Sequence, residues 1–408
     1  MSLNRNALRR TALVSTGTIA LVGIFIYALF MPHRSGDADL WFVPWLNFIA
    51  ENGVIQSLAT SMPVLVEEAN GLGNYTPPYL YLLAVGSIGH GTLDSLTIIK
   101  LVSIAGTFLC AAGVYYLLRN SASADQALIG AAGMFLLPSV LLNAAAWGQS
   151  DAIYSGFCII LVAAALRNNW MIMLAAFGAA LAFKLQAVFI GPFLLYMVVS
   201  RRVPIIWWFT IPIAVYIVFM LPAWLAGRPA LELAMVYFDQ FNTWSWLSMN
   251  APNPWAYVQY FNLMSHEVGV AIGLAVAVTA GLAIAGTSLR WRFEGTDLLL
   301  LALSSAALMP YILPKMHDRY FFIADVLAYA LAVAKPRTWT IAVAVLIQLG
   351  STGAYLAHLY GFKVGTPLGA IAIGIAIFII AVQVIRSLGV LPWSIFHPKF
   401  SESQVKEA

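Results

Sequence analysis

The stretch TALVSTGTIALVGIFIYALFMPHRSGDADL, residues 11–40, decides the class of fold. Its first part, residues 11–31, is an apolar run of about 20 residues, the length that an α-helix needs to cross a bilayer. No A-x-A cleavage motif follows the run, so we expect an uncleaved anchor rather than a signal peptide. A polar turn with Asp37 and Asp39 comes directly after it. The first span therefore leads straight into two carboxylates.

The composition of the whole chain is that of an integral membrane protein. Of its 408 residues 61% are hydrophobic and only 9% are charged, against about 25% charged in soluble domains. The basic residues are scattered singly or in pairs at the ends of apolar runs, which excludes a nucleic-acid partner. Cys110 and Cys158 lie inside apolar runs and indicate neither a disulfide nor a metal site. We predict an all-α integral membrane protein.

The apolar runs predict about 12 transmembrane helices in a single transmembrane domain over residues 1–408. With a cytoplasmic N-terminus, this arrangement puts 14 of the 21 Lys and Arg residues inside and 7 outside, as the positive-inside rule expects. Several runs are shorter than about 20 residues, and the 170–200 region is the least regular. The spans are expected near residues 11–31, 97–118, 126–143, 152–166, 170–184, 187–200, 204–225, 267–288, 297–313, 320–334, 338–357 and 366–386.

The first large external loop covers residues 32–96. Within it, Asp39 to Ala50 and Tyr79 to Gly89 are apolar but too short to span, so we expect helices that lie in the membrane interface. Pro44 should kink or restart the first of them. This frame predicts a multi-pass protein, in a bacterial inner (plasma) membrane, with its loops facing the periplasm or the exterior.

The second large external loop covers residues 226–266 and is rich in aromatic and amide side chains, among them Trp246 and Asn250. Such residues suit the aromatic belt of a membrane protein, and they also suit stacking on sugar rings. Both interpretations stay open from the sequence alone.

Acidic residues beside the spans are candidates for chemistry. An unsatisfied polar group in a bilayer costs several kcal/mol, about the cost of a lost hydrogen bond or more, so ionisable residues at such depth usually have a function. Asp37, next to Gly36, is the first candidate for a catalytic base. The alternative is an N-cap of the following helix, a position for which Asp39 competes. Asp151 is a further candidate, and it too could be only the N-cap of the span that follows.

Cationic residues interrupt the apolar runs at two places. Lys184, two residues before Gln186, must pair with an acid, reach the interface or meet an anionic ligand. Lys315, His317 and Arg319 form a second group at an external span end. Because Lys and Arg are the usual partners of phosphate oxygens, we expect an anion site. The alternative is an internal ion pair of Asp318 with Arg319 or Lys184.

The order of these polar elements resembles the GT-C superfamily of polytopic glycosyltransferases. Gly36-Asp37 is similar to the family's catalytic aspartate in the first external loop, and Asn74-Tyr75-Thr76-Pro77-Pro78 to its Tyr-Pro-Pro element, with Thr76 intervening. Trp147 to Asp151, Lys184-Leu185-Gln186 and His317-Asp318-Arg319 look like three later elements. The likeness extends from about residue 11 to 334 and is nearest to glucosyltransferases of lipid-linked oligosaccharides and to bacterial mannosyltransferase-like relatives. The last two spans carry no assignable motif.

This resemblance implies a membrane glycosyltransferase that moves a hexose from a polyprenyl-phosphate donor to an acceptor hydroxyl on a glycan, lipid or protein, with inversion. It implies no cofactor and no metal. Asp37, or Asp39 in its place, would be the base, and Lys184, His317, Arg319 and Lys315 would bind the donor phosphate. Substrate contacts are expected from Tyr75, Trp147, Gln149, Asp151, Gln186, Trp246 and Asn250.

Two other functions fit the same residues. A transporter or flippase of lipid-linked sugars would also need embedded cations, although the internal repeats common in transporters are not apparent. A lipid-linked polysaccharide ligase or polymerase would use a pyrophosphate-linked oligosaccharide as its donor.

Overall fold

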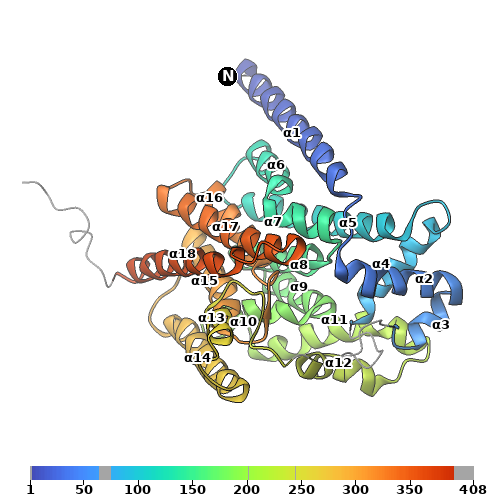
Figure 1. The fold of residues 1–408 in the computed structure, drawn as a ribbon. Coiled ribbons are helices and arrows are strands. Elements are labelled where there is room, and N and C mark those ends of the chain that lie inside the picture. Colours follow the sequence, from blue (N-terminus) through green and yellow to red (C-terminus); the bar gives the residue numbers. More distant parts are fainter. Residues whose placement is uncertain (1, 64–74, 201, 244, 390–408) are drawn as a thin grey trace, which may run out of the picture.

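The computed structural model describes residues 2–63, 75–200, 202–243 and 245–389. Long apolar helices dominate this part of the chain, as the runs of apolar residues predict (Figure 1). Seven of them are long and apolar enough to cross a membrane. They are α1 (Ser2–Phe30), α5 (Ser95–Leu118), α11 (Ile205–Leu225), α14 (His266–Gly286), α15 (Gly295–Ile312), α17 (Thr338–Tyr360) and α18 (Gly365–Ser387).

Shorter helices stand at the other predicted spans. Residues 124–147 form an eighth candidate span that is bent by 60°. Every predicted span has a helical counterpart, which confirms an all-helical, multi-pass membrane protein, while the count of twelve spans stays a prediction. The shorter helices are α6 (Ala124–Gly133), α7 (Pro138–Leu141), α8 (Asp151–Leu166), α9 (Trp170–Phe183), α10 (Gly191–Val199) and α16 (Phe322–Ala334), with η4 (Met134–Leu136), η5 (Leu142–Trp147), η6 (Leu185–Ile190) and η7 (Thr287–Leu289) as tighter or wider helical turns.

The bend in residues 124–147 corrects our expectation of one continuous span over 126–143. Leu137 adopts an extended conformation, and Pro138 starts α7. Proline disfavours a helical conformation of the residue before it, so the helix has to restart there. The last turns, η5, then carry Trp147 toward the interior of the molecule.

The loop predicted to be the first external one is helical where the sequence predicted helices. It contains η1 (Ala38–Phe42), α2 (Val43–Asn52), α3 (Val54–Ala59), α4 (Pro77–Gly86) and η3 (Ser87–Gly89). Pro44 lies in the first turn of α2, a position that suits proline. Helices α2, α3 and α4 lie together at one side of the molecule (Figure 1) around a buried cluster that includes Phe42, Trp45 and Tyr79.

The described residues of the loop predicted to be the second external one contain two helices and a short strand, α12 (Ala230–Thr243), α13 (Pro254–Tyr260) and β1 (Ser248–Met249). Strand β1 pairs in parallel with β2 (Met316–His317), and Ser248 lies opposite Met316. A further bridge joins Asn250 to His317. This pairing, which the sequence did not predict, fixes this second long loop against the segment that carries His317.

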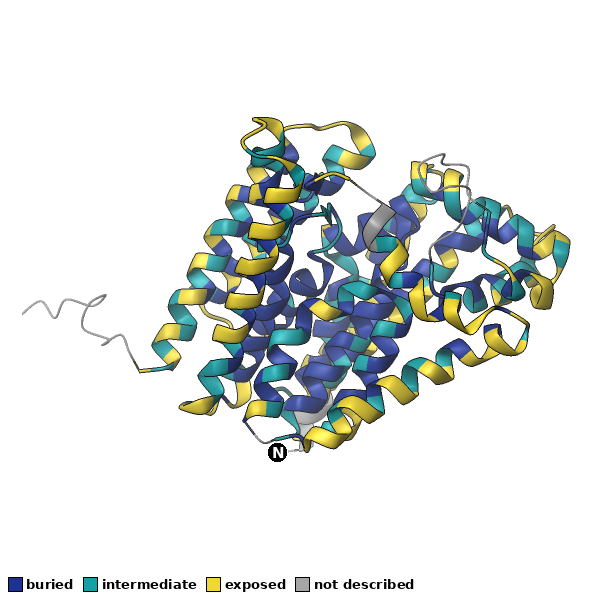
Figure 2. Cartoon of the chain, turned by 90° about the horizontal axis from the view of Figure 1, so that it is seen from below, coloured by how far each residue is buried: buried dark blue, intermediate teal, exposed yellow. Residues whose placement is uncertain are grey.

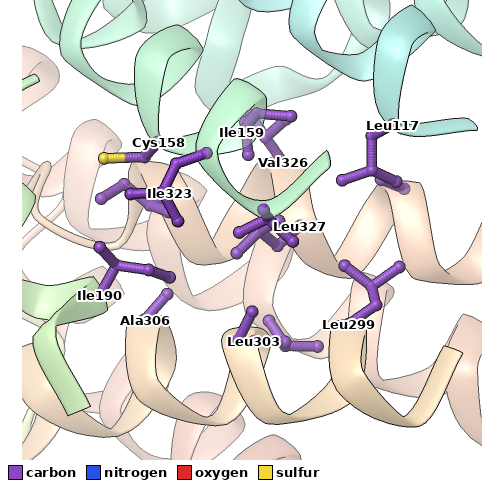
Figure 3. Close-up of a cluster of buried hydrophobic side chains, with 14 of the residues drawn as sticks. Leu117, Cys158, Ile159, Ile190, Leu299, Leu303, Ala306, Ile323, Val326 and Leu327 are labelled. Carbon is purple, nitrogen blue, oxygen red and sulfur yellow. The ribbon is translucent and has the colours of Figure 1, made fainter. Parts of the chain in front are cut away.

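The core lies where α5, α8, α15 and α16 pack together. Leu117, Ile159, Leu303 and Leu327, one from each of these helices, meet there (Figure 3). Helices α5 and α8 approach closely at Gly113, where an added Cβ would lie 3.0 Å from the Gly156 carbonyl oxygen. Small residues permit such close packing of membrane helices.

Buried residues fill the middle of the bundle, and exposed residues cover its outer surface (Figure 2). On α11, for example, the outward residues Ile213, Ile217 and Val218 are apolar and exposed, as expected of a helix that faces lipid. Cys110 and Cys158 are free thiols in the core, which confirms their interpretation as small core residues.

Candidate active site

The segment after α1 is held in place by a lysine from α5. The side chain of Lys100 is fully buried, and its Nζ donates hydrogen bonds to the carbonyl oxygens of Phe30, Met31 and His33 over 2.5–2.9 Å. Carbonyls at a helix C-terminus lack partners within the helix, so a cation there satisfies them. Ser35 adds a second attachment, since its hydroxyl donates to the Trp147 carbonyl oxygen at 2.8 Å.

Asp37 faces the cavity from this segment. Its Oδ2 accepts a hydrogen bond from Gln149 Nε2 and lies 3.6 Å from Arg319 Nη1, with 24% of the side chain exposed. Although Asp37 directly precedes η1, its side chain makes no capping hydrogen bond. The capping alternative therefore lacks its main contact, and the carboxylate is available to a bound molecule.

Asp39 has different surroundings. It forms a surface ion pair with Arg34, with Oδ1 2.5 Å from Nη2, and it does not line the cavity that Asp37 faces. Of the two predicted carboxylates, only Asp37 thus lines the cavity.

Asp151 begins α8 and is fully buried. Its Oδ1 accepts from Lys184 Nζ at 2.8 Å, and its Oδ2 accepts from Asn143 Nδ2 at 2.8 Å. Arg319 Nε lies 3.6 Å from the same Oδ2. Because every contact of this carboxylate is internal, it balances the nearby cations instead of reaching into the cavity.

Arg319 occupies the centre of the site. Besides Asp37 and Asp151, it approaches Asp318, with Nη1 3.7 Å from Oδ1. Burial would lower the pKa of Arg319, but the three carboxylates outweigh it and raise the pKa well above its usual value. Arg319 is therefore a permanent cation. The internal ion pair of Asp318 and Arg319 exists, whereas the acid that pairs with Lys184 is Asp151.

These groups surround a cavity of about 600 Å³. The lining includes eight of the residues predicted for the site, namely Asp37, Tyr75, Lys184, Gln186, Trp246, Asn250, His317 and Arg319. It also includes aromatic and amide side chains such as Trp41, Phe42, Phe183, Gln240 and Gln259. A cavity with charged groups beside apolar and aromatic walls suits a ligand with a polar head and an apolar part.

Besides Asp39, four predicted residues lie outside the lining, namely Trp147, Gln149, Asp151 and Lys315. Trp147, Gln149 and Asp151 are fully buried, so the expected direct contact with substrate is not supported for them. On the side away from the cavity, Gln149 contacts Asp37, and Asp151 and Trp147 contact Arg319. These contacts hold Asp37 and Arg319 in place. Lys315 has a left-handed backbone, with φ of 64°, and its amide donates to the Leu247 carbonyl oxygen at 2.7 Å. Asn74 lies outside the described residues.

His317 differs from the expected cation. It lines the cavity beside Arg319. Burial, followed by the charges of Arg319, His358 and Lys184, lowers the pKa of His317 well below its usual value. We therefore interpret His317 as a neutral hydrogen-bonding group, because a protonated imidazole would be opposed by the neighbouring cations.

Sequence reasoning missed His358, which lies in the last turn of α17 and lines the cavity. Its Nδ1 is 3.1 Å from Asp318 Oδ2. It also missed Asn143 and Tyr355, since the Asn143 amide bridges Asp151 and the Tyr355 hydroxyl. A single imidazole at the end of an apolar span was the available signal for His358.

Comparison with known proteins identifies the fold. Neither a protein-family model nor a curated protein sequence matches the chain. The crystal structure of ArnT from Cupriavidus metallidurans bound to undecaprenyl phosphate does match. The alignment covers 91% of this chain and 77% of that chain, with a TM-score of 0.54 and 15% identity. The chain has the ArnT fold.

A second crystal structure, of the same ArnT in the apo state, agrees. It covers 93% of this chain and 77% of that chain, with a TM-score of 0.53 and 16% identity. At such low identity the likeness to ArnT concerns the fold, and it confirms the GT-C-like membrane architecture predicted from the order of the polar elements.

Proposed function

We propose that the protein is a membrane glycosyltransferase that moves a hexose from a polyprenyl-phosphate donor to an acceptor hydroxyl, on the extracytoplasmic side of a bacterial inner membrane. The observation that carries the proposal is the meeting of Asp37 with Arg319 and Lys184 around one cavity. The ArnT fold supports it, because an ArnT structure contains undecaprenyl phosphate.

The proposed reaction is a single displacement at the anomeric carbon. Asp37 takes the proton of the acceptor hydroxyl, whose oxygen then bonds to that carbon. The bond from the carbon to the phosphate oxygen breaks, and its electron pair stays on the phosphate. Attack from the side opposite the leaving group inverts the anomeric configuration.

The cations would stabilise the phosphate as it leaves. Arg319 is held within 3.6–3.7 Å of Asp37, Asp151 and Asp318, and Lys184 is bonded to Asp151. The positions of these cations are fixed before the substrate arrives, so they need little rearrangement during the reaction. Such preorganised charges are the main source of electrostatic stabilisation in enzymes. Gln149 fixes Asp37 in a similar way, through the hydrogen bond to Oδ2.

The aromatic and amide wall supports a sugar and a lipid as ligands. Trp246 lines the cavity with 56% of its surface exposed. Flat aromatic faces such as this suit sugar rings, while the apolar residues Leu40 and Phe183 on the lining suit an isoprenoid chain.

Transfer from a synthetic donor tests this proposal against a transporter. The purified protein in detergent is given a polyprenyl-phosphate hexose and a panel of acceptors with free hydroxyls, and free polyprenyl phosphate is measured. Release that depends on both the acceptor and the protein is the expected result. If the protein instead moves the lipid across liposome membranes without cleaving it, the flippase is the better account. Release only from pyrophosphate-linked oligosaccharides would favour a ligase or polymerase.

A further inference from the structure

His358 is an ionisable residue at the cavity to which the proposed mechanism gives no role. It lies at the end of α17, with 31% of its side chain exposed. Its ring stacks on Trp147, with the centroids 4.3 Å apart and 18° between the planes. The Arg319 guanidinium lies 5.1 Å from the same indole ring. His358 and Arg319 therefore share one aromatic support beside the cavity.

Asp318 fixes the orientation of this imidazole. Its Oδ2 is 3.1 Å from His358 Nδ1, and its own side chain is only 1% exposed. The Asp318 amide donates to the Met249 carbonyl oxygen at 3.2 Å, which ties it to the β1–β2 pair. A carboxylate on Nδ1 keeps a proton on that nitrogen and stabilises the imidazolium form. Nε2 is then the ring nitrogen left for a bound molecule.

The balance of charge at the site depends on this imidazole. Two cations, Lys184 and Arg319, are matched with three carboxylates, Asp37, Asp151 and Asp318. Without a further cation these groups carry one net negative charge, which would oppose a phosphodiester. His317 stays neutral, because burial and the neighbouring cations lower its pKa. Protonation of His358 would neutralise the site.

We infer that His358 is a further binding residue for the donor: it takes up a proton when the phosphodiester binds, and its Nε2–H donates a hydrogen bond to a phosphate oxygen. The inference rests on the proposed function, since it needs a lipid phosphate as the ligand. The charged and titratable groups that face His358 are Asp318, Arg319 and His317 from the segment after α15, and Asp37 from the segment after α1.

The test measures binding of undecaprenyl methyl phosphate at pH 6 and at pH 8.5. This phosphodiester carries one charge at both values, so any pH dependence comes from the protein. The full-length protein should bind it about tenfold more tightly at pH 6, which corresponds to a change of one unit in the pKa of a coupled group. Undecaprenol, which has no charge, should bind equally at both values.

Three variants locate the titrating group. His358→Gln should bind the phosphodiester weakly and equally at both pH values, because an amide does not take up a proton. Asp318→Asn, which keeps the shape of the side chain, should move the pH dependence to lower pH. The matched control is His33→Gln, since the His33 ring packs at a tilt against Tyr360 near the same end of α17 but does not line the cavity. It should keep the full pH dependence.

The outcomes separate the inference from the proposed function. If the unaltered protein binds undecaprenyl methyl phosphate equally at both pH values, or if His358→Gln keeps the pH dependence, His358 is not the group that takes up the proton. The same holds if His317→Gln, and not His358→Gln, removes it. In these cases the lipid phosphate still binds and the proposed function stands. No binding at either pH would overturn both.

Discussion

Arg319 shows most clearly how single residues are arranged in this site, because three carboxylates surround its guanidinium. In Arg319→Ala the donor phosphate loses a charge-assisted hydrogen bond. We expect donor binding to weaken by about 1.5–3 kcal/mol, with a smaller effect on the acceptor. Binding of a polyprenyl-phosphate analogue and of an acceptor, measured separately, checks this. Unchanged donor binding would mean that Arg319 serves only to balance the carboxylates.

The pair of Lys184 and Asp151 has a different consequence, because both side chains are almost fully buried. Lys184→Met removes the cation bonded to Asp151 Oδ1 and leaves the carboxylate only Asn143 and the more distant Arg319, both on Oδ2, which should destabilise the protein by about 3–5 kcal/mol. Asp151→Asn in the same chain removes the carboxylate charge that has lost its closest cation and should restore part of that loss. Thermal unfolding of the single and double variants in one detergent gives the comparison. If the single variant Lys184→Met and the double variant are equally stable, the ion pair of Lys184 and Asp151 does not contribute as expected.

Individual site residues could be predicted from the sequence to the extent that they interrupt apolar runs. Asp37, Lys184, His317 and Arg319 did so, and all four line the cavity. What the sequence could not provide was the pairing. Whether Lys184 meets Asp151 or Asp318 depends on how far α9 and η6 extend into the bundle, and that is a property of packing.

Among the structural elements, the contact of α5 with the end of α1 matters most for the site. Lys100 of α5 donates hydrogen bonds to three carbonyl groups just before Asp37. Lys100→Met would take this donor from the Met31 and His33 carbonyl oxygens, at a cost of about 1–3 kcal/mol for each group left unsatisfied, whereas the Phe30 carbonyl oxygen still accepts from the His33 amide. We expect a lower melting temperature and slower transfer. Lys100→Arg, which keeps the charge and several donors, should retain more of both. Equal loss in the two variants would show that the size of the side chain is decisive.

Helices were the elements that the sequence predicted best, because their apolar runs are long and end at polar residues. The exceptions have physical causes. The bend between α6 and α7 comes from a single proline, Pro138. The β1–β2 pair joins two-residue strands, too short for any alternation of polar and apolar residues to reveal. His358 escaped notice because a lone imidazole in an apolar span has no neighbouring polar residue to form a motif.

For the molecule as a whole, all ends of helices that meet at the cavity should lie on one side of the membrane. Single cysteines at Trp246 and Arg290 test this, since the charge distribution puts Trp246 outside and Arg290 inside. Cys110 and Cys158 are buried and should react little. A membrane-impermeant maleimide applied to intact cells should label the first position and spare the second until the membrane is opened. The reverse labelling pattern would invert the proposed orientation.

The overall architecture could be predicted because the order of polar elements along the chain resembled that of GT-C enzymes, and the ArnT fold bears this out. The number of spans could not be fixed in the same way. Within the described part of the chain, four apolar helical segments contain 10–17 residues, which is fewer than a straight crossing requires. Composition cannot decide whether such helices cross the bilayer or end within the bundle.

Transfer by Asp37→Asn, compared with Asp39→Asn, tests the central claim most directly. The asparagine keeps the shape and an acceptor oxygen but cannot take a proton, and a general base is worth about 10²–10⁴ in rate. Asp39 has only a surface ion pair with Arg34, which contributes little. With donor binding intact, Asp37→Asn should transfer the sugar at least about a hundredfold more slowly, and Asp39→Asn at nearly the normal rate. Near-normal transfer by Asp37→Asn, or the opposite ranking of the two variants, would contradict the assignment of Asp37 as the base.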